Sequence, residues 1–268
     1  MRLLLIFAIT LISLACGSTS TGANANVVAV ATPPVNTSTP SSSAASGNVN
    51  IRSADGLVLV GSIYPSDKPN SPAVLLLHQW QSDRHSYDAF AKQLQAKGFN
   101  VLSIDGRGFG ESTKTGDGKT VTPERTDAAV KAMLGDVEAA FKYLSEQKNV
   151  DPKRIGIVGA SYGSSLALIY AADHPNVAAV ALLSPGLNYF GNMPTEPSIK
   201  KYGDRPILLV AADDDKESAD SVKKLKADGA NDKYEVQIYP KGGHGTGLFG
   251  AKVGLENLLE GFFTKSLK

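Results

Sequence analysis

A serine at the centre of a short glycine-flanked segment is the residue of this chain best suited to chemistry. Residues 159–163 read Gly-Ala-Ser-Tyr-Gly, after an apolar run at 154–158 and before a helical pattern at 164–172. At a strand-to-helix junction this G-x-S-x-G spacing exposes the serine hydroxyl on a strained turn, which needs small residues two positions away on either side. The helix that follows would direct free N–H groups and its positive dipole end at the group under attack. We therefore predict that Ser161 is a nucleophile.

The partners that a serine nucleophile needs follow later in the chain. Three consecutive aspartates, 213–215, come after the apolar run 206–212, and His244 lies in the glycine-rich segment 241–245 after the run 234–239. A serine hydroxyl is a poor nucleophile until a base takes its proton, and histidine suits that task because its ordinary pKa is about 6.5. A carboxylate can fix the imidazole tautomer and stabilise the imidazolium. The order is therefore serine, aspartate, histidine.

Along the chain, apolar runs typical of strands alternate with helical patterns, and these elements must position the three residues. This alternation predicts a mostly parallel, twisted sheet of about eight strands with helices on both faces. Loops at the carboxyl ends of parallel strands carry the chemistry in such folds, and the serine, the aspartates and the histidine all fall just after their strands. The expected strands are 49–53, 57–64, 73–77, 99–104, 154–158, 177–183, 206–211 and 234–239, and the expected helices are 86–97, 123–148, 164–172, 218–228 and 248–266.

Across nearly all of residues 49–268 the chain resembles an α/β hydrolase of the dienelactone-hydrolase-like and small serine esterase group. The resemblance rests on segments 77–80 (Leu-His-Gln-Trp) and 105–112 (Asp-Gly-Arg-Gly-Phe-Gly-Glu-Ser), on the serine turn and on the Gly-Gly-His-Gly loop, in the chain order of that fold. It implies a carboxylesterase that forms an acyl-enzyme on Ser161, which a water activated by His244 then hydrolyses. It implies no cofactor and no metal.

The resemblance also implies the finer site assignments. Family members place the triad acid nine positions after the proline that opens its strand, which from Pro206 gives Asp215, with Asp213 as the next candidate. The oxyanion hole would use the backbone N–H of Tyr162, directly after the nucleophile, and that of Trp80, by a match of 78–80 to the family's His-Gly-x. Gln79 stands where glycine is usual.

Three further polar residues are interpreted as structural. His78 is expected to order the loop after its strand and not to act as a second base. Arg107 is expected to satisfy buried carbonyls or to pair with Asp105. His174 precedes a proline at the end of a helix, where a histidine suits the helix dipole.

The segment 184–205 is too short for a helical lid domain, so we expect no large cap and an open site. Such a site favours small or extended acyl substrates, and therefore a small-molecule ester. A peptidase or an acyl-transferring hydrolase of the same fold is one alternative, and a non-catalytic cell-surface binding protein is another. The expected apolar walls are Tyr189, Phe190, Met193 and Pro194 on one side and Trp80 and Tyr162 on the other.

The N-terminal segment resembles a bacterial lipoprotein signal. A positive start at Met1–Arg2 and an apolar run at 3–14, too short to span a bilayer, precede Cys16, the only cysteine. We expect a signal peptide at 1–15, a disordered Ser/Thr/Pro/Ala-rich tether at 16–48, and a hydrolase domain at 49–268. The protein would be exported and lipid-anchored at Cys16 in the bacterial cell envelope, or alternatively secreted.

Charge composition argues against one class of partner. The chain has 27 basic and 26 acidic residues and no basic cluster, so nucleic-acid binding has no support.

Overall fold

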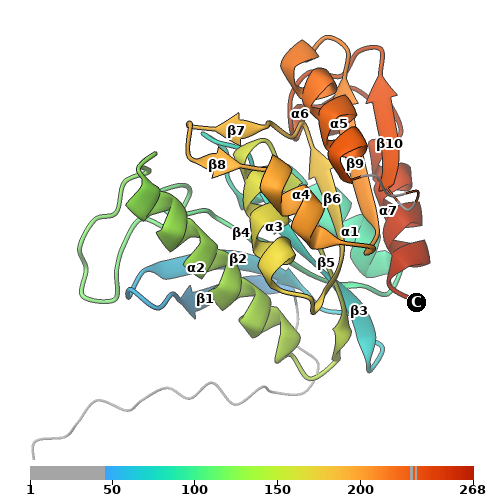
Figure 1. The fold of residues 1–268 in the computed structure, drawn as a ribbon. Coiled ribbons are helices and arrows are strands. Elements are labelled where there is room, and N and C mark those ends of the chain that lie inside the picture. The colour runs from blue at the N-terminus through green and yellow to red at the C-terminus, as the bar shows by residue number, and fades with distance from the viewer. Residues whose placement is uncertain (1–45, 230–231, 233) are drawn as a thin grey trace, which may run out of the picture. The chain divides into compact units, whose positions relative to one another are not determined.

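The structure is a computed structural model that describes residues 46–229, 232 and 234–268 (Figure 1). The expected signal peptide, Cys16 and nearly all of the expected tether lie outside the described residues. The first strand begins at Gly47, two residues before the expected start of the domain. No helix in the described part of the chain is long and apolar enough to cross a membrane.

An eight-stranded sheet forms the centre of the domain, which confirms the expected α/β-hydrolase architecture. Its order is β1-β2-β4-β3-β5-β6-β9-β10, in which β2 pairs antiparallel with β1 and β4, and the strands from β4 to β10 are parallel to one another. The strands are β1 (Gly47–Arg52), β2 (Val58–Tyr64), β3 (Ser71–Leu77), β4 (Asn100–Ile104), β5 (Val150–Ala160), β6 (Val177–Leu183), β9 (Ile207–Ala212) and β10 (Tyr234–Tyr239), and a separate two-stranded sheet consists of β7 (Asn188–Tyr189) and β8 (Met193–Pro194).

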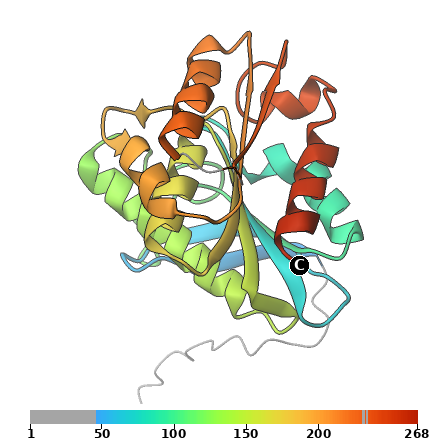
Figure 2. The same cartoon turned by 45° about the vertical axis from the view of Figure 1, so that its right-hand side comes forward.

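Helices cover both faces of the sheet, and Figure 2 shows the two helical layers on opposite sides of the strands. One face is covered by α2 (Asp127–Ser145), α3 (Tyr162–Asp173), α4 (Glu196–Tyr202) and α5 (Lys216–Gly229). The other face is covered by α1 (Asp88–Ala96), which follows the 3₁₀ turn η1 (Arg84–Tyr87), and by α6 (Gly247–Gly250) and α7 (Leu255–Ser266).

Alternate side chains of the central strands belong to different halves of the core. In β3, Leu75 and Leu77 pack in the cluster under α2 and α3, whereas Val74 and Leu76 pack in the cluster under α1 and α7. Burial on both faces explains why the parallel strands are nearly continuous apolar runs in the sequence.

Some helix boundaries differ from the expected ones for local reasons. The helix expected from residue 123 begins at Asp127, because Thr126 is extended and its hydroxyl accepts a hydrogen bond from Ala129 N at 3.2 Å, as an N-cap does. The helix expected at 248–266 is divided into α6 and α7 by Gly254, which has a left-handed backbone (φ 81°). Neither β7 nor β8 was expected.

Candidate active site

Ser161 lies on a sharp turn between β5, which ends at Ala160, and α3, which begins at Tyr162. Its backbone has φ 52° and ψ −123°, a conformation that costs a non-glycine residue about 1–3 kcal/mol. The flanking glycines are required sterically. A Cβ on Gly159 would lie 2.1 Å from the carbonyl oxygen of Gly163, and a Cβ on Gly163 would lie 2.6 Å from the carbonyl oxygens of Leu77 and His78.

The predicted nucleophile, base and acid form one continuous set of hydrogen bonds. Ser161 Oγ lies 2.7 Å from His244 Nε2, and His244 Nδ1 lies 2.7 Å from Asp215 Oδ2. This spacing fits a neutral imidazole that donates from Nδ1 to the carboxylate and accepts the serine proton at Nε2. Of the two acids that the sequence left open, Asp215 is the one that contacts the imidazole.

Asp214, directly before that acid, has a different position that the sequence did not indicate. Its carboxylate accepts hydrogen bonds from the backbone N–H groups of Gly242 at 3.1 Å and Gly243 at 3.1 Å. These bonds hold the pKa of Asp214 below its ordinary value. The two neighbouring aspartates therefore contact different parts of one segment, Asp214 its backbone and Asp215 the imidazole of His244.

The two N–H groups predicted for an oxyanion hole lie at the ends of neighbouring elements. Tyr162 is the first residue of α3, where a helix leaves its N–H groups without an internal acceptor. Trp80 follows β3, and its ring centroid lies 5.4 Å from that of Tyr162. Within the described residues, neither N–H donates a hydrogen bond to another protein group.

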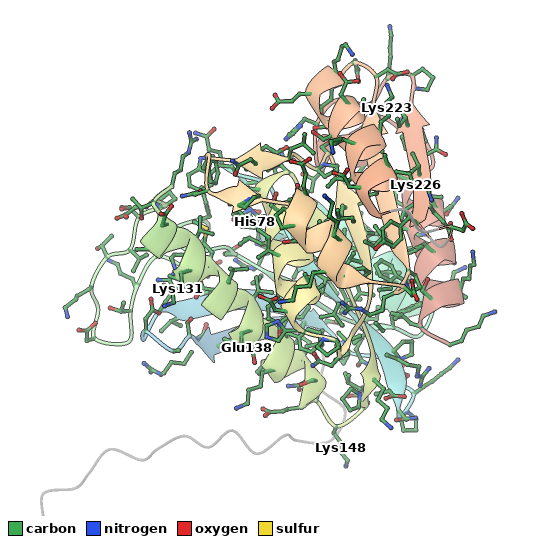
Figure 3. The ribbon with its side chains drawn as sticks, viewed as in Figure 1. His78, Lys131, Glu138, Lys148, Lys223 and Lys226 are labelled. Carbon is green, nitrogen blue, oxygen red and sulfur yellow. The ribbon has the colours of Figure 1, made fainter. Side chains whose placement is uncertain are left out.

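His78 orders the loop that carries Trp80. Its side chain is buried inside the fold, whereas Lys131, Lys148 and Lys223 are exposed on helices or loops (Figure 3). Nε2 accepts from Gly106 N at 2.7 Å, so Nδ1 carries the proton and donates it to the carbonyl oxygen of Gln79 at 2.7 Å. Burial lowers the pKa of His78. Because Nδ1 bonds the loop after β3 and Nε2 bonds the loop after β4, His78 has the geometry of the expected structural residue.

An aromatic cluster stands beside the serine turn. The Trp80 ring makes edge contacts with Phe109 and Phe190, each at a centroid distance of 4.8 Å. The guanidinium of Arg125, an exposed residue, lies 4.9 Å from the Trp80 centroid and 4.8 Å from that of Phe190. Neither Phe109 nor Arg125 was expected here, because both come from loops distant in sequence from the serine.

One expected wall residue does not face the site. Met193 is completely buried in the core between β8 and the helices, so it cannot contact a substrate that enters from solvent. Tyr189, one strand earlier, is half-buried and donates from its hydroxyl to the carbonyl oxygen of Ser184 at 2.9 Å.

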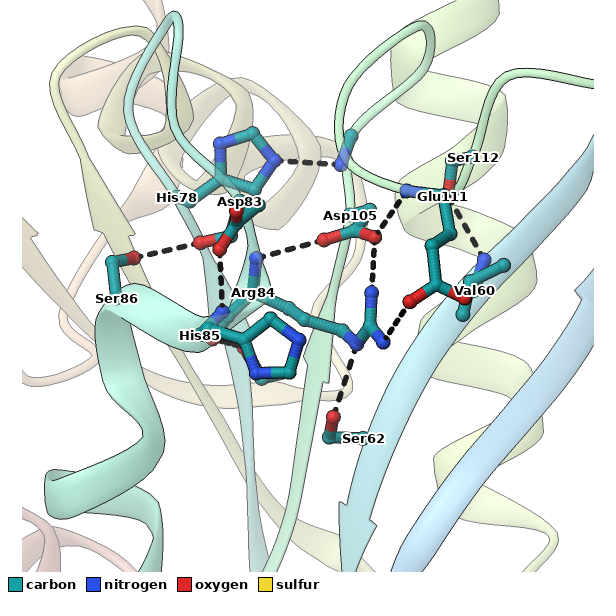
Figure 4. A network of polar contacts seen from close by, with 12 residues as sticks. Val60, Ser62, His78, Asp83, Arg84, His85, Ser86, Asp105, Glu111 and Ser112 are labelled. Atoms are coloured by element: carbon teal, nitrogen blue, oxygen red, sulfur yellow. Dashed lines mark hydrogen bonds and ion pairs between the residues drawn. The ribbon is translucent and has the colours of Figure 1, made fainter.

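The expected pairing of Arg107 with Asp105 is wrong. Asp105 is completely buried and pairs with Arg84, a residue that the sequence did not single out (Figure 4). Its carboxylate also accepts from Arg84 N and from Glu111 N, each at 2.8 Å. The arginine in turn contacts Ser62 Oγ at 3.1 Å and Glu111 at 2.7 Å. This network fixes the loop after β4 to the turn that precedes α1.

Arg107 instead joins the loop after β4 to α2. It donates to Asp136 from Nε at 2.9 Å and from Nη2 at 2.7 Å, and it contacts the half-exposed Asp55 at 2.7 Å. Asp136 also accepts from Ser53 Oγ at 2.6 Å, and burial raises its pKa against the effect of these hydrogen bonds. The arginine is structural, as expected, but with other partners.

His174 lies at the end of α3, as expected. Its ring stacks on that of Tyr170 at a centroid distance of 3.9 Å, and its Nδ1 lies 2.7 Å from the Tyr170 carbonyl oxygen.

The sheet order and the serine turn define an α/β hydrolase. More narrowly, the chain belongs to the dienelactone hydrolase family, which matches residues 59–248. An uncharacterized protein of Mycobacterium tuberculosis is 30% identical over 215 residues, which cover 74% of this chain and 72% of that protein. The fold is similar to that of a dienelactone hydrolase from Anabaena variabilis, with a TM-score of 0.65 and 19% identity over 84% of this chain and 99% of the other. It is also similar to that of an esterase from Pyrococcus furiosus, with a TM-score of 0.66 and 18% identity over 84% and 94%.

Proposed function

We propose that the protein is a serine hydrolase that cleaves carboxylic esters through an acyl-enzyme on Ser161. The observation that carries the proposal is the unbroken set of hydrogen bonds from Ser161 through His244 to Asp215. Membership of a family of hydrolases and the likeness to esterase folds support the same class of reaction.

In the proposed reaction, Ser161 Oγ attacks the ester carbonyl carbon while its proton moves to His244 Nε2. Asp215 keeps the imidazole in the required tautomer and stabilises the imidazolium. The alcohol leaves with the proton from His244, and a water that gives its proton to the same nitrogen then attacks the acyl-enzyme. The carboxylic acid is released and Ser161 regains its proton.

The oxyanion formed in each step would be stabilised by the N–H groups of Trp80 and Tyr162. Removing one donor of this kind typically lowers the rate about a hundred- to a thousandfold. The positive end of α3 adds a favourable field at the same place.

The site favours a small acyl ester that approaches from solvent. His244 is 42% exposed, and the two strands between β6 and β9 are too short to form a lid. The rings of Trp80 and Phe190 provide apolar surface for an acyl or alcohol group.

The test is the intact mass of the protein after incubation with a fluorophosphonate, together with hydrolysis of para-nitrophenyl acetate. We expect one adduct and measurable turnover, both lost in Ser161→Ala. A folded wild-type protein with neither would refute the hydrolase and favour a binding protein. Cleavage of peptide substrates without turnover of esters would instead favour a peptidase.

We also propose that the protein is exported and lipid-anchored through Cys16. The apolar run at 3–14 and the position of this single cysteine after it support the proposal. Metabolic labelling of the expressed full chain with an alkynyl fatty acid should mark the wild type and not Cys16→Ser. Equal labelling of the two proteins would contradict the anchor.

A further inference from the structure

The segment that carries the base is held by side chains from three other loops. This histidine loop, residues 240–246, lies between β10 and α6. Its backbone N–H groups donate to the carboxylate of Asp214, to Ser184 Oγ at 2.8 Å from Gly245, and to Gln79 Oε1 at 2.7 Å from Thr246. Each of the three accepting residues follows a different strand of the sheet.

Gln79 contacts both the backbone and the side chain of Thr246 in the histidine loop. Its amide oxygen also accepts from Thr246 Oγ1 at 3.1 Å. It lies so close to the residue after His244 that a Cβ on Gly245 would stand 2.0 Å from it, and Gly245 has φ +60°. The glycine therefore permits both the turn and the approach of the glutamine.

The main chain of Gln79 is fixed at the same time. Its carbonyl oxygen accepts from His78 Nδ1, and His78 Nε2 accepts from Gly106 N. Hydrogen bonds therefore run from the loop after β4, through His78 and Gln79, to Thr246 in the histidine loop. This series of hydrogen bonds includes Gln79, the residue directly before Trp80, whose N–H is the proposed oxyanion donor. A glycine, which the resemblance would place at position 79, has no side chain with which to complete it.

We propose that Gln79 is a positioning residue that keeps His244 over Ser161, an inference that rests on the hydrolase function proposed above. Without the amide, the half-exposed imidazole would have fewer restraints and would spend less time 2.7 Å from the serine hydroxyl. Both proton transfers depend on that distance, whereas initial binding of the ester does not. The loss should therefore fall on kcat and leave KM nearly unchanged.

The experiment measures kcat and KM for para-nitrophenyl acetate from about pH 5 to about pH 9 with the full chain. The variants are Gln79→Ala, which removes the acceptor, and Gln79→Glu, which keeps an acceptor oxygen and adds a negative charge. Gln95→Ala is the matched control, because Gln95 in α1 also makes two hydrogen bonds, to Ser46 Oγ and to the carbonyl oxygen of Pro65. Rates are divided by the concentration of folded sites, titrated with a fluorophosphonate.

We expect Gln79→Ala to lower kcat about 10- to 100-fold per titrated site, with KM within about twofold of wild type. Gln95→Ala should behave as wild type. Gln79→Glu should restore most of kcat at high pH. Its added charge favours the imidazolium, so the acid limb of its pH profile should move to higher pH.

The outcomes separate this inference from the function on which it rests. A wild-type protein that hydrolyses nothing and takes up no fluorophosphonate overturns the proposed function, and the inference falls with it. An active wild type with an unimpaired Gln79→Ala overturns the inference alone. So does a Gln79→Glu variant that is as slow per titrated site as Gln79→Ala with an unmoved acid limb, because an acceptor oxygen at position 79 would then not position His244.

Discussion

The buried pair of Arg84 and Asp105 provides the sharpest test of how the loops under the site are held. The proposed change is Asp105→Asn, which preserves the shape of the side chain. Asp105 supplies acceptors to Arg84 N, Glu111 N and the Arg84 guanidinium. An asparagine can still accept from Arg84 N, but its NH₂ group faces the other two donors.

The expected cost follows from the burial of both partners. The exposed fraction of the side chain is 2% for Arg84 and 0% for Asp105. Removing one member of a buried ion pair leaves the other charge without its partner, which costs about 3–5 kcal/mol. Domains of this size have unfolding free energies of about 5–15 kcal/mol, so Asp105→Asn should remove a large part of the total and lower the Tm by about 6–20 °C.

Urea unfolding followed by circular dichroism, with thermal melts as a second measurement, provides the assay. The matched control is Glu111→Gln, because Glu111 is the second acid that contacts Arg84 but its side chain is 61% exposed. Its removal should leave the transition near that of wild type, since solvent screens the exposed carboxylate of Glu111. An Asp105→Asn variant with the same urea midpoint and Tm as Glu111→Gln would refute the reasoning.

Three further predictions concern the site itself. Burial lowers the pKa of His78, so below its ordinary value of 6.5 the unfolded chain binds a proton that the folded chain does not. This contribution to the free energy of unfolding is complete above about pH 6.5 and falls with decreasing pH by at most about 1.4 kcal/mol per pH unit. Urea unfolding at pH 5 and 7 should therefore show a weaker pH dependence of stability in His78→Gln than in wild type. Equal dependence in the two proteins would contradict this prediction. Gly163→Ala places a Cβ against the carbonyl oxygens of Leu77 and His78 and should lower kcat/KM for an ester about a hundredfold or more, whereas Gly261→Ala in α7, where nothing lies within 4 Å, should not. Asp214→Ala removes the acceptor for Gly242 N and Gly243 N and should lower kcat about tenfold, whereas Asp213→Ala should leave kcat unchanged. A loss of kcat in Asp213→Ala but not in Asp214→Ala would contradict the role of Asp214 in holding this segment.

The order of strands and helices was predictable because the central parallel strands are apolar on both faces and end at polar or glycine-rich loops. The position of Ser161 followed from the same reasoning, since only small residues at 159 and 163 permit the turn. The identity of the aspartate that contacts His244 did not follow from composition. Asp214 and Asp215 contact different groups although they are neighbours, and the resemblance, not the spacing, favoured Asp215.

Pairings between distant polar residues were not predictable from the sequence. Arg107 and Asp136 are 29 positions apart, and nothing in the pattern of either segment indicates that they meet. Arg84 lies in a turn with an ordinary mixture of polar residues, yet its side chain is buried. Such contacts depend on how the loops cross above the sheet, which local periodicity does not contain.

The strand order has a consequence for the way in which activity is lost. The strand that leads to the serine, β5, lies in the interior of the sheet. In the described part of the chain, β10, which leads to the histidine, pairs with a neighbour on one side only. Val236 at the middle of β10 is 42% exposed, so this side chain adds little to the packing of the strand. Edge segments open locally at a lower free energy than the whole domain unfolds. Mild heating should therefore separate base from nucleophile reversibly while the interior strands remain intact, and turnover becomes a sensitive reporter of fraying at a single edge.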